Sequence, residues 1–254
     1  AAILIPLFYL YVMKLPEGAF FGLLSAIALL GLYEFYRIFR LSRLLSVVSI
    51  FAGLILLWSL YRGYAYTVEI LALIFITVAS VRMLFPKDPS GALRDTGLAI
   101  TGIIYIILLI SFQLKLRHSG PEWIIFLYGA IWISDSSAYY IGSAIGKRKL
   151  YPQLSPKKTV EGAIASVAGG VGGSFVLVSI LKIETLQSFS ILLLGIIIGT
   201  LCIAGDLIET MYKRDGGVKD SSNLIPGHGG ILDKIDSALV VAPFVYWYIK
   251  LTGL

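Results

Sequence analysis

The sequence has little of what a water-soluble or disulfide-stabilised protein needs. Of its 254 residues only 14% are charged, and it has one cysteine and two histidines. The single Cys202 excludes a disulfide framework and a metal site made of several cysteines. A strict alternation of polar and apolar side chains is also missing, which excludes a transmembrane β-barrel.

Long apolar runs dominate the chain instead. Hydrophobic residues make up 57% of it, whereas soluble domains rarely exceed about half. Runs near the length of about 20 residues that a membrane-crossing helix needs recur from end to end. They predict a single-domain, all-α polytopic integral membrane protein with about nine transmembrane helices and no cleaved signal. The predicted spans cover residues 1–13, 18–38, 44–62, 66–85, 96–114, 122–146, 159–181, 188–214 and 231–251.

The basic residues predict how these spans are oriented. Fifteen of the 21 Lys and Arg residues lie around the loops that follow the second, fourth, sixth and eighth spans. The positive-inside rule therefore places these loops and the N-terminus in the cytoplasm. At the end of the second span, Glu34, Arg37 and Arg40 are interpreted as an interfacial charge cluster.

Four acids at the cytoplasmic ends of the last two spans indicate a functional site. Asp206 and Glu209 are three residues apart, as are Asp233 and Asp236, so each pair shares a helix face. Singly they have structural explanations, because acids in a first turn complement the helix dipole and Glu209 can pair with Lys213. Together they favour a hard cation such as Mg²⁺, with Asp206 and Asp233 at the centre of the site.

The loop between these spans, "PGHGG", adds groups that suit an anion. Glycine lets backbone amides approach a ligand closely, and a helix N-terminus presents free N–H groups. Cations and donors flank the loop, so we interpret the segment as a polyphosphate site; the alternative for the glycines alone is a flexible turn. The residues concerned are Gly227, His228, Gly229, Gly230, Lys213, Arg214 and Lys219.

A second polar segment, "SPKKTVEG", precedes the seventh span. Ser155 or Thr159 is expected to cap that helix, and Lys157 and Lys158 lie beside its N-terminus, where they suit a phosphate or a lipid headgroup. Asp135 lies inside the sixth span, so it is expected to face the bundle interior and to reach the metal or a lysine.

These blocks resemble a known family. The stretch "KRDGGVKDSSNLIPGHGGILDKIDS", residues 213–237, resembles the signature of the phosphatidate cytidylyltransferases, also called CDP-diacylglycerol synthases, as do "SPKKTVEG" and "GDLIET". The resemblance covers roughly residues 132–237. Thr210 stands where the family usually has Ser, and Lys234 stands where it usually has Arg.

The resemblance implies the Mg²⁺-dependent reaction of CTP with phosphatidate to give CDP-diacylglycerol and pyrophosphate at the cytoplasmic face of the plasma (bacterial inner) membrane. Asp206 and Asp233 are assigned to the metal, with Glu209, Asp236 and Asp135 as supporting ligands or ligands of a second cation. Lys213, Arg214, Lys219 and His228 are assigned to phosphate, while Ser155, Lys157, Lys158, Thr159 and the loop glycines bind substrate.

Other functions remain alternatives at this point. A CTP-dependent polyprenol or phytol kinase would use the same nucleotide and release CDP. A secondary transporter would show internal repeats and a site at the middle of the membrane. Membrane lipids are expected partners and nucleic acid is not, and GxxxG pairs such as Gly142/Gly146 permit a homodimer.

Overall fold

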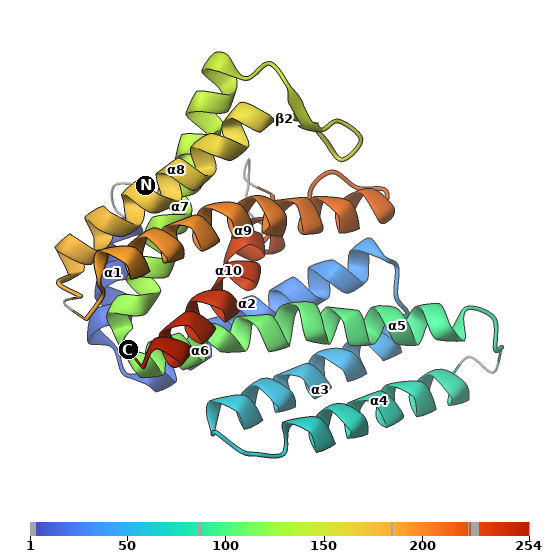
Figure 1. Ribbon diagram of the computed structural model, residues 1–254. Helices are drawn as coiled ribbons and strands as arrows, with labels where there is room; N and C mark the ends of the chain where they lie inside the picture. Colours follow the sequence, from blue (N-terminus) through green and yellow to red (C-terminus); the bar gives the residue numbers. More distant parts are fainter. Residues whose placement is uncertain (1–3, 86–87, 184, 223, 225–228, 254) are drawn as a thin grey trace.

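The computed structural model confirms an all-α membrane protein (Figure 1). It describes residues 4–253 except 86–87, 184, 223 and 225–228. Within these residues, eight helices are long and apolar enough to cross a membrane. The predicted first span coincides with α1, whose 11 described residues are fewer than the about 20 that a crossing needs.

The helices follow the apolar runs closely, since burying the backbone in lipid requires every peptide group to be paired within the segment. The helix observed at the predicted span 96–114 is longer than the prediction. It extends over Ala92–Ser119 and comprises α5, a π-helical segment and α6. The elements are α1 Leu4–Lys14, α2 Glu17–Ile38, α3 Arg43–Tyr61, α4 Thr67–Leu84, α5 Ala92–Gly102, η1 Ile103–Leu108, α6 Leu109–Ser119, α7 Pro121–Ile145, β1 Lys149–Tyr151, β2 Ser155–Thr159, α8 Val160–Leu181, α9 Ser188–Asp215 and α10 Leu232–Thr252.

The helices form two groups joined through α10 (Figure 1). On one side α7 packs on α8 and α8 packs on α9, while on the other side α3 packs on α4 and on η1. Between them α10 contacts both α9 and α6. The core therefore continues from one group to the other, with buried residues such as Leu32, Ile106 and Leu239.

Glycines allow the helices around α9 to approach at backbone distance. A Cβ added at Gly205 of α9 would lie 2.9 Å from the carbonyl oxygen of Asp236 and 2.9 Å from the Cα of Ser237, both in α10. A Cβ added at Gly170 of α8 would lie 2.9 Å from the backbone nitrogen of Gly199 in α9. These close approaches pack α8 and α10 directly against α9, and the one at Gly205 lies beside Asp206 and Asp236.

A short antiparallel hairpin, β1 with β2, connects α7 to α8 and projects beyond the helix ends (Figure 1). The sequence did not predict these strands, because a stretch of lysines, prolines and serine lacks the alternating apolar pattern of a half-buried strand. The hairpin places Lys157 and Lys158 on a strand, immediately before the first turn of α8.

Candidate active site

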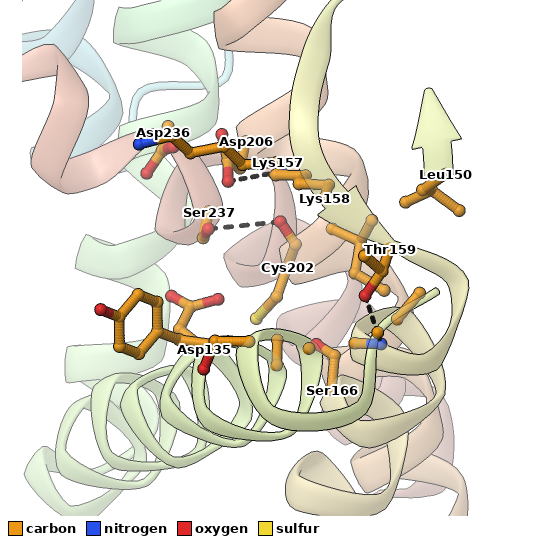
Figure 2. A pocket seen from close by; sticks show the side chains of 18 of the residues that line it. Asp135, Leu150, Lys157, Lys158, Thr159, Ser166, Cys202, Asp206, Asp236 and Ser237 are labelled. Atoms are coloured by element: carbon orange, nitrogen blue, oxygen red, sulfur yellow. Dashed lines mark hydrogen bonds and ion pairs between the residues drawn. The ribbon is translucent and has the colours of Figure 1, made fainter. Parts of the chain in front are cut away.

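A cavity of about 800 Å³ lies where α7, α8, α9, α10 and the hairpin meet (Figure 2). Acids and lysines share its wall with small and apolar side chains. Its polar lining includes Asp135, Lys157, Lys158, Thr159, Asp206, Glu209, Lys213, Asp233 and Asp236. The cavity is large enough for a nucleotide-sized ligand, because small-molecule sites commonly enclose about 300–1,000 Å³.

The cavity extends inward from one end of the bundle. Asp206 and Asp135 lie nine and ten residues before the ends of α9 and α7, which at about 1.5 Å per residue is about 15 Å from the helix ends. Polar groups at that depth are costly in a membrane and mark function by default. The site therefore reaches from the bundle end into the membrane-spanning region.

Three carboxylates gather at one point of the wall. Asp206, Glu209 and Asp236 each offer an oxygen, and these atoms all lie within 4.8 Å of one another. Glu209 is 1% exposed, and its Oε1 is buried with no hydrogen-bond partner among the residues that the structure describes. An unpaired buried carboxylate oxygen among other carboxylates suits a divalent cation, and all-oxygen donors suit Mg²⁺. The residues present therefore fit the predicted metal.

Asp233 lies beside this group in a different environment. Its Oδ1 is 2.6 Å from Lys213 Nζ, and its Oδ2 accepts hydrogen bonds from the backbone N–H groups of Gly230 at 2.7 Å and Ser221 at 3.2 Å. Lys213 also forms an ion pair with Glu209, one helical turn before it. Lys213 thus links Asp233 to the three-carboxylate group, in which Asp233 itself has no place.

Asp135 also lies outside the three-carboxylate group, although it lines the same cavity. In Figure 2 it lies apart from Asp206 and Asp236, on α7. Its side chain is exposed and lines the cavity, so its predicted role as a metal ligand stays a prediction.

The hairpin supplies the basic side of the cavity. Lys158 Nζ forms an ion pair with Asp206, which joins β2 to α9 (Figure 2). Thr159 caps α8 as predicted: its Oγ1 accepts a hydrogen bond from the N–H of Gly162 at 3.1 Å. Lys157 lines the cavity and is exposed, whereas Ser155 lies on β2 outside the lining.

The other predicted residues that the structure describes do not line the cavity. Arg214 is exposed and donates to the carbonyl oxygen of Val218 at 3.1 Å, and Lys219 is exposed. Gly229 and Gly230 lie next to Asp233, and Gly229 has a φ of 80°, a backbone conformation that favours glycine. Gly227 and His228 lie outside the described residues.

The two departures from the family signature differ in their surroundings. Thr210 is buried and its Oγ1 donates to Asp206 Oδ1 at 3.2 Å, so the hydroxyl supports a carboxylate of the site. Lys234 is exposed on the first turn of α10.

One buried acid was misinterpreted from the sequence. Glu34 is 2% exposed, and it forms no ion pair with Arg37 or Arg40 in the described part of the chain. Instead it accepts hydrogen bonds from the segments on either side of residues 223–230, including Ser222 Oγ at 2.6 Å. An acid at the end of an apolar span is the same signal that marked Asp206.

The fold and the cavity define a class of protein: a polytopic membrane protein with a carboxylate-and-lysine site at one end of its helix bundle. Comparison with known sequences gives the family. The sequence model of the cytidylyltransferase family matches residues 1–252, so the chain belongs to that family.

Individual relatives carry a more specific name. The chain is 38% identical over 163 residues to the phosphatidate cytidylyltransferase of Bacillus subtilis, an alignment covering 62% of this chain and 59% of the relative. It is 47% identical over 131 residues to that of Synechocystis, covering 50% and 43%. It is 30% identical over 237 residues to that of Thermotoga maritima, covering 91% and 87%. The chain thus spans about half the length of the first two relatives and most of the third.

Proposed function

We propose that this protein is a phosphatidate cytidylyltransferase, which converts CTP and phosphatidate into CDP-diacylglycerol and pyrophosphate. The observation that carries the proposal is the 800 Å³ cavity, which holds three converging carboxylates and the lysines of β2 and α9 at one end of a membrane bundle. Relatives with this name align with half or more of the chain and, in one case, with 91% of it.

The reaction needs charge neutralisation and alignment more than a strong base. A phosphate oxygen of phosphatidate attacks the α-phosphorus of CTP, a new P–O–P bond forms, and the bond from the α-phosphorus to the bridging oxygen breaks as pyrophosphate leaves. The attacking phosphate monoester is already largely ionised near neutral pH, since its second pKa is about 6. No shifted general base is therefore required.

Named residues account for the charge. Asp206, Glu209 and Asp236 would hold Mg²⁺, which when bound neutralises phosphate charge and orients the leaving group. Lys157 and Lys158 line the cavity at the base of the hairpin and are placed to bind phosphate oxygens. Lys213 holds Asp233 and Glu209 in place and contributes positive charge on the α9 side. Preorganised cations of this kind stabilise the charge that develops on transferring phosphoryl groups.

The location suits one soluble and one lipid substrate. The cavity lies at the end of the bundle that carries most of the Lys and Arg residues, so we propose that it faces the cytoplasm, where CTP is available. Tyr139 of α7 lines the cavity and is 70% exposed. The wall on this side therefore opens towards the lipid-facing surface, where the acyl chains of phosphatidate would remain.

Pyrophosphate release by the purified protein in detergent tests the proposal. With CTP, phosphatidate and Mg²⁺ all present we expect stoichiometric pyrophosphate and CDP-diacylglycerol, and omission of any one should abolish both. Release of CDP without pyrophosphate, together with a phosphorylated lipid alcohol when one is supplied, would refute the proposal in favour of a lipid kinase.

A further inference from the structure

Glu34 is a buried carboxylate that the proposed reaction does not use. It lies near the end of α2, is 2% exposed and does not line the large cavity. Among the described residues, four groups lie within hydrogen-bond distance of its two oxygens: Ser222 Oγ at 2.6 Å, Ser221 Oγ at 2.9 Å, and the backbone N–H groups of Leu232 at 2.9 Å and Ile231 at 3.0 Å. Such a number of partners is what a buried charge requires.

These donors come from two places in the sequence. Ser221 and Ser222 precede residues 223–230, and Ile231 and Leu232 follow them, so one side chain of α2 joins both ends of that stretch. Gly230 lies against the same carboxylate, because a Cβ added there would collide with both oxygens of Glu34. A larger residue at this position would require the Glu34 carboxylate and the Ser221 hydroxyl to move.

The backbone contacts of Glu34 are those of a helix cap. The first N–H groups of a helix have no partner within the helix and are normally satisfied by a nearby side chain. The residue at the N-cap position of α10, Ile231, has no capping side chain. Glu34 takes over this role from another helix, across 197 and 198 residues of sequence.

The start of α10 determines where the site carboxylates lie. Asp233 and Asp236 belong to its first two turns, and Asp236 reaches the three-carboxylate group with Asp206 and Glu209. Ser221 Oγ lies 2.9 Å from Glu34 Oε2 and 2.9 Å from Asp233 Oδ2, so the cap is directly connected to Asp233.

We infer that Glu34 is a positioning residue for this site: by capping α10 from α2, it fixes Asp236 against Asp206 and Glu209 and so maintains the geometry that binds the divalent cation. The consequence for catalysis depends on the proposed function, whereas the consequence for the backbone of residues 229–233 does not.

The test uses Glu34→Gln in the full-length protein, with Glu69→Gln as a matched control, because Glu69 is an exposed acid outside both the cavity and the cap. Glutamine keeps one acceptor oxygen and turns an N–H₂ group towards the donors. Backbone amide hydrogen exchange in metal-free protein should therefore accelerate at residues 229–233 in Glu34→Gln and stay unchanged in the control.

Turnover measured over a Mg²⁺ series gives the second readout. Removing an outer partner of a metal site typically costs about tenfold or more in metal affinity. We expect the Mg²⁺ concentration for half-maximal turnover to rise by about tenfold in Glu34→Gln, and excess Mg²⁺ to restore most of the turnover. A protein that has merely lost its fold would not recover in this way.

The inference fails if exchange at residues 229–233 is unaltered, or if turnover is lost at every Mg²⁺ concentration. If wild type itself shows no turnover, the proposed reaction is wrong and the exchange experiment alone decides the role of Glu34. Glu34→Ala removes the acceptor of Ser222 Oγ and of the N–H groups of Ile231 and Leu232, whereas Ser221 Oγ keeps Asp233 Oδ2 as a partner. It should therefore accelerate exchange further than Glu34→Gln, and equal exchange in the two variants would also overturn the capping role.

Discussion

The sequence analysis assigned Asp206 and Asp233 the same role as metal ligands, but the two carboxylates have different surroundings. Asp206 has a side chain that is 42% exposed and is paired with Lys158, while Asp233 is 12% exposed and is held by Lys213 and by two backbone amides. The first carboxylate is therefore available to a ligand, and the second is largely used in holding the chain together.

A matched pair of substitutions separates these roles. Asp206→Asn should lower turnover by about 100-fold and change the free energy of unfolding by less than about 1 kcal/mol, because its ion pair is partly exposed. Asp233→Asn should lower stability by about 1–3 kcal/mol, since buried donors lose a charged acceptor.

Chemical denaturation and pyrophosphate release on the same preparations measure both effects. Near-normal turnover in Asp206→Asn would remove this residue from the proposed metal site. Unchanged stability in Asp233→Asn would show that its hydrogen bonds with Ser221 and Gly230 do not contribute to stability.

At the scale of elements, the site depends on how closely α9 and α10 approach. Gly205 lies one residue before Asp206 and faces the backbone of Asp236 and Ser237 in α10. The closeness of the two helices is what allows carboxylates from both to share a space of a few ångströms.

Gly205→Ala should therefore separate the two helices. Its Cβ would meet backbone atoms at 2.9 Å, which cannot rotate away, so we expect a loss of about 1–3 kcal/mol in stability together with a large loss of turnover. Gly172→Ala is the control, because a Cβ at this exposed position of α8 meets nothing within 4 Å.

The control should raise stability by up to about 1 kcal/mol through helix propensity alone. Denaturation curves for the two alanine variants provide the comparison. Equal stabilities would mean that the contact between α9 and α10 can accommodate a Cβ at Gly205.

At the scale of the whole molecule, the distribution of Lys and Arg residues predicts that the end of the bundle with the cavity faces the cytoplasm. The hairpin turn at Gln153 lies at the site end, and Tyr64 lies in the loop between α3 and α4 at the opposite end. A membrane-impermeant maleimide applied to intact cells should label Tyr64→Cys but not Gln153→Cys, and permeabilised cells should label both.

The chain provides its own background control for this experiment. Cys202 is 0% exposed, so wild-type protein should remain unlabelled in both conditions. Labelling of Gln153→Cys in intact cells would contradict the predicted orientation, because the cavity would then face away from the cytoplasm, where CTP is available.

The local sequence was enough to predict the helices and the polar segments. Which side chains meet in the site depends on contacts between residues far apart in the chain. Run length predicts the spans, and a spacing of three predicts that Asp206 and Glu209 share a face. Asp236 rather than Asp233 completes the three-carboxylate group with Asp206 and Glu209. This depends on the rotation and approach of α10 against α9, which no local pattern encodes. Glu34 capping a helix 197 residues away is inaccessible to sequence patterns for the same reason.

The ion pairs in the cavity have a consequence for how the binding of two ligands would be coupled. Lys158 holds Asp206, and Lys213 holds Glu209, so two ammonium groups occupy carboxylates that a divalent cation also requires. In the proposed function, a cation bound at Asp206 would release Lys158 to meet a phosphate, and a phosphate that attracts Lys158 would free Asp206 for the cation. By thermodynamic linkage each ligand would then raise the affinity for the other to the same extent, with the two ligands replacing the ion pair that the protein forms by itself.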